Sequence, residues 1–271
     1  MRPSPEQLAL LNRTERVSFE IADFLAQHRL TPASEAYLSV VLGAIIFSCG
    51  SNRLDVRGIE HFDGMGKKDR VIIVANHRSF FDFFSITAIL YWRTNLTKRI
   101  FFPTRSTFFY DHPAGPAVNL AMSAMRMFPP ILRDKKKTSF NDFAIERLIE
   151  ELKVPGTIVG VHPEGTRNKS ADPYEFLPAQ IGVGKLALAV DPGVKIIPTF
   201  VLGMGNSLPG ELKMNVMDPE RHKIDLFFGA PIDFSDLRAK GGRLATYKKA
   251  ADRCMEHIKV LAERQRREAG A

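Results

Sequence analysis

The sequence predicts an α/β fold in which helices flank a mostly parallel, twisted sheet. Short β-rich runs alternate with helical patterns after Gly50, which is typical of this class. The runs are apolar almost throughout, as are strands buried on both faces. The 271 residues are 45% hydrophobic and 25% charged, close to the globular average, which excludes a disordered or fibrous chain.

The first 50 residues predict two helices. Residues 6–29 space apolar side chains at helical intervals among charges, which indicates an amphipathic helix. A second helix is expected to start at Thr31, with Pro32 at its first position, and to include the uncharged run Tyr37–Cys49. This run is shorter than the roughly 18 apolar residues of a spanning helix, so we expect no transmembrane segment. Its pattern fits a buried core helix and an interfacial helix on a membrane equally well.

The remaining chain supplies the elements of the sheet and its flanking helices. We expect strands at 71–75, 99–103, 157–161, 194–201 and 223–229. We expect helices at about 79–92, 115–125, 138–152, 180–190 and 241–267. No polar linker or internal repeat interrupts this order, so the part after residue 50 forms one domain.

Charge and cysteine content limit the environment of the protein. The net charge of +8 attracts polyanions, including nucleic acid, anionic lipid surfaces and phosphorylated small molecules. Basic residues concentrate at 93–105 and in RDKKK at 133–137. Cys49 and Cys254 lie in apolar helical patterns, which predicts buried free thiols and a cytoplasmic setting. The N-terminus lacks the apolar stretch of a signal peptide, so we expect no secretion.

The first candidate motif is VIIVANHRSFFDFF at 71–84. It places His77 in a turn after a strand, and Asp82 follows five residues further on, in the first turn of a helix. Asp82 could hydrogen-bond one imidazole nitrogen and leave the other as a base. The structural alternative is a capping box, in which Ser79 caps the helix and Asp82 takes the position usually held by Glu.

The second candidate motif is GTIVGVHPEGTRNKS at 156–170, where another strand ends in a polar turn. Gly165 would let the backbone approach a ligand closely, and Thr166 could donate a hydrogen bond to it. Arg167 offers a planar fork suited to phosphate. An ordinary β-turn with a surface arginine is the alternative. If the sheet is parallel, both motifs lie at its carboxyl edge, where open α/β sheets bind ligands.

The sequence resembles the glycerolphosphate and lysophospholipid acyltransferase family over roughly residues 55–232. Four blocks carry the resemblance, in order: NHRSFFD at 76–82, MFPPILRD at 127–134, HPEGTR at 162–167 and VKIIPTF at 194–200. The chain departs from the family pattern at two places. Pro129 and Pro130 precede Ile131 in the second block, with no Asp before Arg133, and His162 stands where the family usually has Phe.

The resemblance implies a role for each matching residue. His77 would be the general base and Asp82 its orienting partner. Glu164, Gly165 and Arg167 would form part of the acceptor site, and Arg133 would be a second phosphate contact. The Phe pairs near these motifs are interpreted either as core or as the lining of an acyl channel.

The implied activity is transfer of a fatty acyl group from acyl-CoA or acyl-carrier protein to a lysophospholipid hydroxyl. The expected reaction converts lysophosphatidic acid to phosphatidic acid, with no metal and no other cofactor. The chain contains no G-x-S-x-G elbow and no H-x-x-x-H pair, which disfavours a serine hydrolase and a zinc enzyme. A lyso-ornithine lipid or a non-phosphate lipid is the alternative acceptor.

The resemblance also implies how the chain is divided into domains and which partners it binds. Residues 1–50 would be a membrane-associating motif and 51–271 the catalytic domain, held peripherally on the cytoplasmic side of the membrane. The partners would be membrane lipids and the acyl donor. A basic nucleic-acid-binding module is the competing class, but no helix-turn-helix or ribonucleoprotein motif supports it, so we expect no nucleic-acid partner.

Overall fold

The fold centres on a six-stranded sheet with the order β1-β8-β7-β2-β6-β3. The computed structural model describes residues 1–27, 30–96, 99–105 and 108–270. The strands are β1 (Leu54–Arg57), β2 (Val71–Ala75), β3 (Arg99–Phe101), β6 (Thr157–Val161), β7 (Lys195–Leu202) and β8 (Ile224–Phe228). All neighbours pair in parallel except β7 and β8. A separate pair joins β4 (Thr104–Arg105) to β5 (Pro130–Ile131). The predicted mostly parallel sheet is confirmed.

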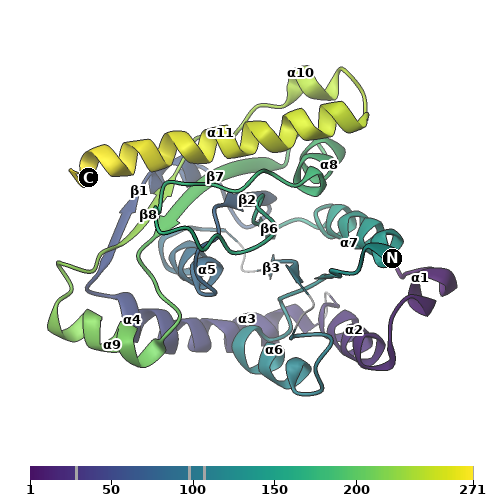
Figure 1. Cartoon of the computed structure of the whole chain (residues 1–271), viewed down its shortest axis with the longest axis horizontal. Helices are drawn as coiled ribbons and strands as arrows, with labels where there is room; N and C mark the ends of the chain where they lie inside the picture. Colours follow the sequence, from purple (N-terminus) through teal and green to yellow (C-terminus); the bar gives the residue numbers. More distant parts are fainter. Residues whose placement is uncertain (28–29, 97–98, 106–107, 271) are drawn as a thin grey trace.

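Helices cover both faces of the sheet (Figure 1). Helices α8 and α11 lie on one face, and α5 lies on the other. Helices α3 (Thr31–Leu42), α4 (Ser48–Gly50), α6 and α9 form a further layer beyond α5. The bounds are α5 (Asp82–Arg93), α6 (Gly115–Ser123), α7 (Thr138–Glu151), α8 (Ile181–Ala189), α9 (Leu208–Met217), α10 (Ser235–Arg238) and α11 (Leu244–Glu268).

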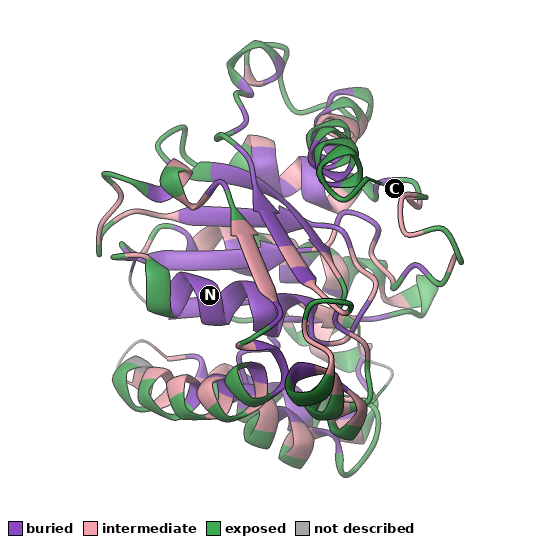
Figure 2. Ribbon diagram, turned by 90° about the vertical axis from the view of Figure 1, so that its left-hand side faces the viewer, coloured by how far each residue is buried: buried purple, intermediate pink, exposed green. Residues whose placement is uncertain are grey.

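Two hydrophobic cores sandwich the sheet, and this explains the apolar strands. Along β2, Ile72 and Val74 pack into the core beneath α8 and α11. Their neighbours Val71, Ile73 and Ala75 pack into the core around α5. Successive side chains of a strand point to opposite faces, so a strand covered on both faces must be apolar at every position. Figure 2 shows the buried sheet between its helices.

The first predicted helix is two helices, α1 (Pro5–Ala9) and α2 (Arg13–Leu25). Asn12 separates them, since its Oδ1 accepts the N–H of Glu15 at 2.9 Å and its own N–H donates to Glu15 Oε2 at 2.8 Å. This capping box starts a new helix inside what the apolar spacing presents as one. The expected end of the helix, at residues 28 and 29, lies outside the described residues.

The second predicted helix runs from Thr31 to Gly50 through α3 (Thr31–Leu42), a π-helical turn (Gly43–Phe47) and α4 (Ser48–Gly50). One side of it is core, since Leu38, Leu42 and Ile46 are buried. The other side is open, with Val40 72% and Phe47 62% exposed. The core reading therefore holds for one face of the helix, and the opposite face is exposed and apolar.

This helix also corrects the expectation that no segment is long enough to span a membrane. By length and composition, Pro32–Gly50 could cross one, with a mean hydropathy of 1.5. The expected helix length rested on the uncharged run Tyr37–Cys49 alone. The apolar helical segment is longer than this run, because it also includes the residues from Pro32 onward. Core helices of soluble proteins pass the same test of length and composition, so the test alone does not identify a spanning helix; 28% of the tested window is buried inside the protein.

Other differences lie at element ends and in short elements. The strand expected to end at residue 103 ends at Phe101, because Phe102 N–H turns away and donates to the carbonyl of Arg126 at 3.0 Å. The sequence analysis missed β1, an edge strand of four residues whose side chains are only partly buried. It also missed α9, whose buried side chains include the polar Glu211 and Asn215, so apolar periodicity could not reveal it.

Candidate active site

Both candidate motifs lie at one edge of the sheet. Strands β2 and β6 are parallel neighbours, with Val74 opposite Val161. His77 follows the last residue of β2 by two positions, and His162 directly follows β6. The carboxyl ends of the two strands therefore bring the NHRSFFD and HPEGTR turns together, as the sequence predicts.

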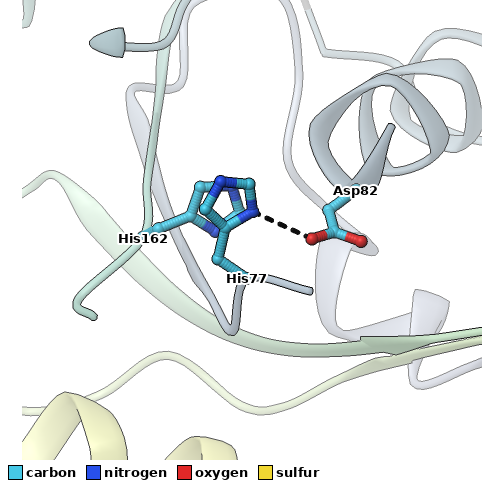
Figure 3. Close-up of side chains that lie close together, drawn as sticks. All are labelled: His77, Asp82 and His162. Atoms are coloured by element: carbon cyan, nitrogen blue, oxygen red, sulfur yellow. Dashed lines mark hydrogen bonds and ion pairs between the residues drawn. The ribbon is translucent and has the colours of Figure 1, made fainter. Parts of the chain in front are cut away.

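His77 and Asp82 form a hydrogen-bonded pair (Figure 3). His77 Nδ1 lies 3.0 Å from Asp82 Oδ2. An ionised carboxylate only accepts hydrogen bonds, so Nδ1 carries the proton and Nε2 keeps a free lone pair. Asp82 Oδ2 also accepts the N–H groups of Arg78 at 2.7 Å and Ser79 at 2.8 Å. These bonds fix the carboxylate at the start of α5.

The alternative capping box is present only in part: Asp82 accepts the N–H of Ser79 at 2.8 Å, but Ser79 is not the residue at the start of α5. Helix α5 starts at Asp82, and no side chain caps its N-terminus. The Ser79 hydroxyl instead donates to the carbonyl of Gly205 at 2.9 Å and accepts the N–H of Phe81 at 3.1 Å. Ser79 thus ties the NHRSFFD turn to the loop after β7, and Asp82 accepts hydrogen bonds from the two backbone amides and the imidazole.

Burial favours a neutral imidazole at His77. Burial, together with the smaller effect of the positive charge of Arg167, lowers the pKa of His77 from the ordinary 6.5 to about 3. Burial raises the pKa of Asp82 to about 6, although the amides of Ser79 and Arg78 oppose this shift. At neutral pH His77 is therefore unprotonated, as a base must be, and Asp82 is ionised.

His162 is a site residue that the sequence analysis did not select. Its ring stacks on His77 with centroids 3.8 Å apart and an interplanar angle of 7° (Figure 3). Its Nδ1 lies 3.0 Å from the carbonyl oxygen of Ala75, so this nitrogen donates. On its other side His162 contacts Phe83, at a centroid distance of 4.3 Å. The stacked ring of His162 therefore restricts rotation of the His77 imidazole out of its present plane.

The position of His162 in the sequence could have indicated that it belongs to the site. It follows a buried strand directly, as part of the same turn that carries Arg167. Burial lowers the pKa of His162 to about 3, so its ring is neutral beside His77. Gly160 supports this packing, because a Cβ there would lie 2.3 Å from the Phe83 ring.

His77, Asp82 and His162 also contain the donor types of a metal site. One ligand atom from each lies within 4.8 Å of the others. The two rings are nearly parallel, however, so their lone pairs do not converge on one point between them. His77 Nδ1 and Asp82 are also bonded to each other. This geometry suits a proton-transfer pair better than a metal centre, and the expectation of no metal stays a prediction.

Glu164 is buried beneath the NHRSFFD turn that carries His77. Its Oε2 accepts the N–H of His77 at 2.7 Å, and its Oε1 accepts the N–H of Leu177 at 2.9 Å. The carboxylate therefore holds the backbone of His77 against the loop that follows the HPEGTR turn. Gly165 adopts a left-handed conformation with φ of 64°, which favours glycine. Thr166 is half-buried beside it.

The two arginines predicted to bind phosphate have different surroundings. Arg167 is exposed, and its charge acts on His77. Its Nη1 donates to Oδ1 of Asn206 at 3.4 Å. Arg133 is also exposed and lies near Arg105, where burial and the charge of Arg133 lower the pKa of Arg105. Arg167 thus lies near the His77–Asp82 pair, and Arg133 belongs to a basic area next to the β4–β5 pair.

The Phe pairs beside the motifs form a connected set of aromatic rings. Phe83, Phe84 and Phe102 are buried in the core around α5. Phe80 is only partly buried and stacks on Phe109 at a centroid distance of 5.8 Å. Most of the rings are core, while Phe80 is partly buried and Phe108, which contacts Phe109, is 40% exposed.

A His–Asp pair at the carboxyl edge of an α/β sheet, with an arginine beside it, has the geometry of a site for proton transfer. The sequence model of the family described as Acyltransferase matches residues 53–202, and the chain belongs to that family. The chain is similar to the crystal structure of the 1-acyl-sn-glycerophosphate (LPA) acyltransferase PlsC from Thermotoga maritima. The identity is 18%, with 96% of this chain and 86% of that chain covered and a TM-score of 0.47. No curated protein matches the sequence.

Proposed function

We propose that this acyltransferase moves a fatty acyl group from an acyl thioester to the hydroxyl of a lysophospholipid. The donor would be acyl-CoA or acyl-carrier protein, and the reaction would convert lysophosphatidic acid to phosphatidic acid. The observation that carries the proposal is the His77–Asp82 pair, held 3.0 Å apart with the base nitrogen free and Arg167 close by. No metal or further cofactor is needed for this chemistry.

The proposed reaction uses His77 first as a base and then as an acid. Nε2 takes the proton of the acceptor hydroxyl while its oxygen forms a bond to the thioester carbonyl carbon. Asp82 stabilises the imidazolium that results. The carbon–sulfur bond then breaks, and the leaving thiol recovers the proton from His77. The acyl group passes directly to the acceptor, so no enzyme nucleophile takes part.

Arg167 and Arg133 are proposed to bind the acceptor phosphate, with Gly165 and Thr166 shaping the turn and Glu164 holding it. Replacing Arg167 or Arg133 with Lys is expected to raise the apparent KM for lysophosphatidic acid about 10-fold or more, since Lys keeps the charge but loses the bidentate fork. The apparent KM for the acyl donor should change little. Steady-state kinetics with each substrate varied in turn would measure both. Wild-type acceptor KM in both variants would contradict the phosphate assignment.

A donor and acceptor panel tests the activity itself. The purified protein would be incubated with acyl-CoA or acyl-carrier protein and a set of lyso-lipids, and mass spectrometry would identify the products. Phosphatidic acid formation is the expected result. The position of Arg133 near Arg105 supports a second candidate, in which only Arg167 faces the acceptor and the substrate is a lyso-ornithine or non-phosphate lipid. Products from those lipids alone would favour the second candidate.

We also propose that the enzyme works as a peripheral protein on the cytoplasmic face of a membrane. Its lipid acceptor resides in a bilayer, and the α3–α4 helix combines a core side with an exposed apolar side. Phe47 also contacts Trp92, at a centroid distance of 6.5 Å, and aromatic side chains of this kind favour the membrane interface. Cys49 and Cys254 are free thiols, in line with a reducing compartment.

Replacing both Val40 and Phe47 with Ser is expected to weaken vesicle binding that persists at high salt, because insertion of apolar side chains is not screened. The fold should be retained, since both side chains are exposed. Co-sedimentation with anionic vesicles at low and high salt would measure this. A double variant of the exposed Leu244 and Val260 on α11, also to Ser, is the matched control. Equal loss in both variants would contradict the assignment.

A further inference from the structure

Helix α9 has the reverse of the usual surface-helix pattern. Its polar residues Glu211 and Asn215 are buried, at 4% and 3% exposure. Its apolar residues Leu212, Val216 and Met217 face outward, at 46%, 68% and 72% exposure. A helix on a water-facing surface normally buries its apolar side and exposes its polar side. The outer face of α9 is therefore built for an apolar environment.

Buried polar contacts hold α9 in this orientation. Oε2 of Glu211 accepts a hydrogen bond from Nη1 of the buried Arg53 at 2.6 Å. Nδ2 of Asn215 donates to the carbonyl of Ser48 at 2.8 Å, and its Oδ1 accepts the N–H of Asn52 at 2.9 Å. Rotating the helix to bury its apolar side would break these bonds and leave charged and amide groups unpaired. The exposed apolar face is thus a stable property of the fold.

The exposed face of α9 continues the apolar surface of the N-terminal helix. Ser48, the partner of Asn215, belongs to α4, so the two helices pack directly against each other. Figure 1 shows α9, α4 and α3 in the same outer layer, on the opposite side of the molecule from α11. Both helices carry exposed apolar side chains in this layer, at Val40 and Phe47 on the N-terminal helix and at Leu212, Val216 and Met217 on α9.

The same region is linked to the candidate active site. Asn206 lies just before α9, and its Oδ1 accepts the N–H of Phe80 at 2.8 Å and a hydrogen bond from Arg167 Nη1 at 3.4 Å. Ser79 donates to the carbonyl of the neighbouring Gly205. The loop that carries α9 therefore touches both the catalytic turn and the arginine proposed to bind the acceptor.

We propose that the outer face of α9, formed by Leu212, Val216 and Met217, inserts into the surface of a lipid bilayer. It forms a second membrane contact beside α3–α4, and it holds the acceptor side of the active site at the lipid surface. The bilayer is the occupant that fits because the adjoining helix has the composition of a membrane segment, and Lys213 on the outer face can extend to anionic headgroups. This inference rests on the proposed lipid acceptor.

The test uses the triple variant Leu212→Ser, Val216→Ser and Met217→Ser in the full chain. We expect about 10- to 100-fold weaker partitioning onto anionic phosphatidylglycerol–phosphatidylcholine vesicles at high salt, since the apolar area available for insertion is lost. The apparent KM for lysophosphatidic acid in vesicles should rise in parallel. Turnover with a short-chain, monomeric lysophosphatidic acid should stay at the wild-type value. The variant of Leu244 and Val260 should match wild type in all three measurements.

Other outcomes overturn the inference in distinguishable ways. Unchanged vesicle partitioning in the triple variant removes the membrane role of α9. A wild-type protein that forms dimers without lipid, and a triple variant that is monomeric, would assign the face to a second copy of the chain. A wild-type protein that acylates no lipid but binds vesicles through α9 would refute the proposed function and leave the membrane contact standing.

Discussion

Replacing His77 with Ala is expected to lower turnover by roughly 100- to 10,000-fold, the usual contribution of a positioned general base. Nε2 of His77 is the atom proposed to take the acceptor proton, and Nδ1 of the same ring lies 3.0 Å from Asp82 Oδ2. The acceptor KM should change far less than turnover, because the phosphate is proposed to bind at the arginines. Steady-state turnover with acyl-CoA and lysophosphatidic acid would measure the loss.

The Asp82 variants separate orientation from charge. Asp82→Asn keeps an oxygen that can accept from Arg78 and Ser79 but loses the negative charge beside the imidazolium, so we expect activity between wild type and Asp82→Ala. His257→Ala, on the outer surface of α11, is the matched control and should have wild-type turnover. Wild-type turnover in His77→Ala would refute the base assignment outright.

The sequence predicted the hydrogen-bonded contact between His77 and Asp82 because its signal is local. A buried strand, a polar turn and a helix start lie within fourteen residues, and parallel strands put such turns at one edge. The roles of the surrounding residues depend on contacts from distant parts of the chain. Glu164 bonds to the amide of His77, and Asn206 joins Phe80 to Arg167. No spacing rule could have found these, since each joins segments about 40 or more residues apart.

The same reasoning explains the errors at the ends of helices and in the outer layer. The apolar spacing of residues 6–29 continues across a break that the polar pair Asn12 and Glu15 creates. Helix α9 was missed because periodicity finds helices with apolar buried faces, and α9 has a polar one. The run Tyr37–Cys49 could not be divided into core and surface, because a uniformly apolar sequence does not indicate which side a protein covers.

Deleting residues 1–50 is expected to unfold or aggregate the remaining chain. Leu38, Leu42, Ile46 and Cys49 belong to the core around α5, and Phe19 belongs to the core on the other face of the sheet. Losing a single buried side chain of this size typically costs about 2–5 kcal/mol, and a whole domain is stable by only about 5–15 kcal/mol. The loss of several at once exceeds that margin.

Buried ion pairs across the same boundary strengthen this expectation. Arg147 Nη1 lies 2.7 Å from Asp23 Oδ1, and Lys137 Nζ lies 2.6 Å from Glu15 Oε2, so the deletion would leave both cations without these partners. Far-UV circular dichroism and the soluble fraction would measure the outcome. The Val40 and Phe47 double variant is the control, because it changes the exposed side of the same helix and should fold. A 51–271 fragment that is soluble and unfolds cooperatively would contradict the prediction. It would show that this part of the chain folds without the buried contacts that residues 1–50 supply.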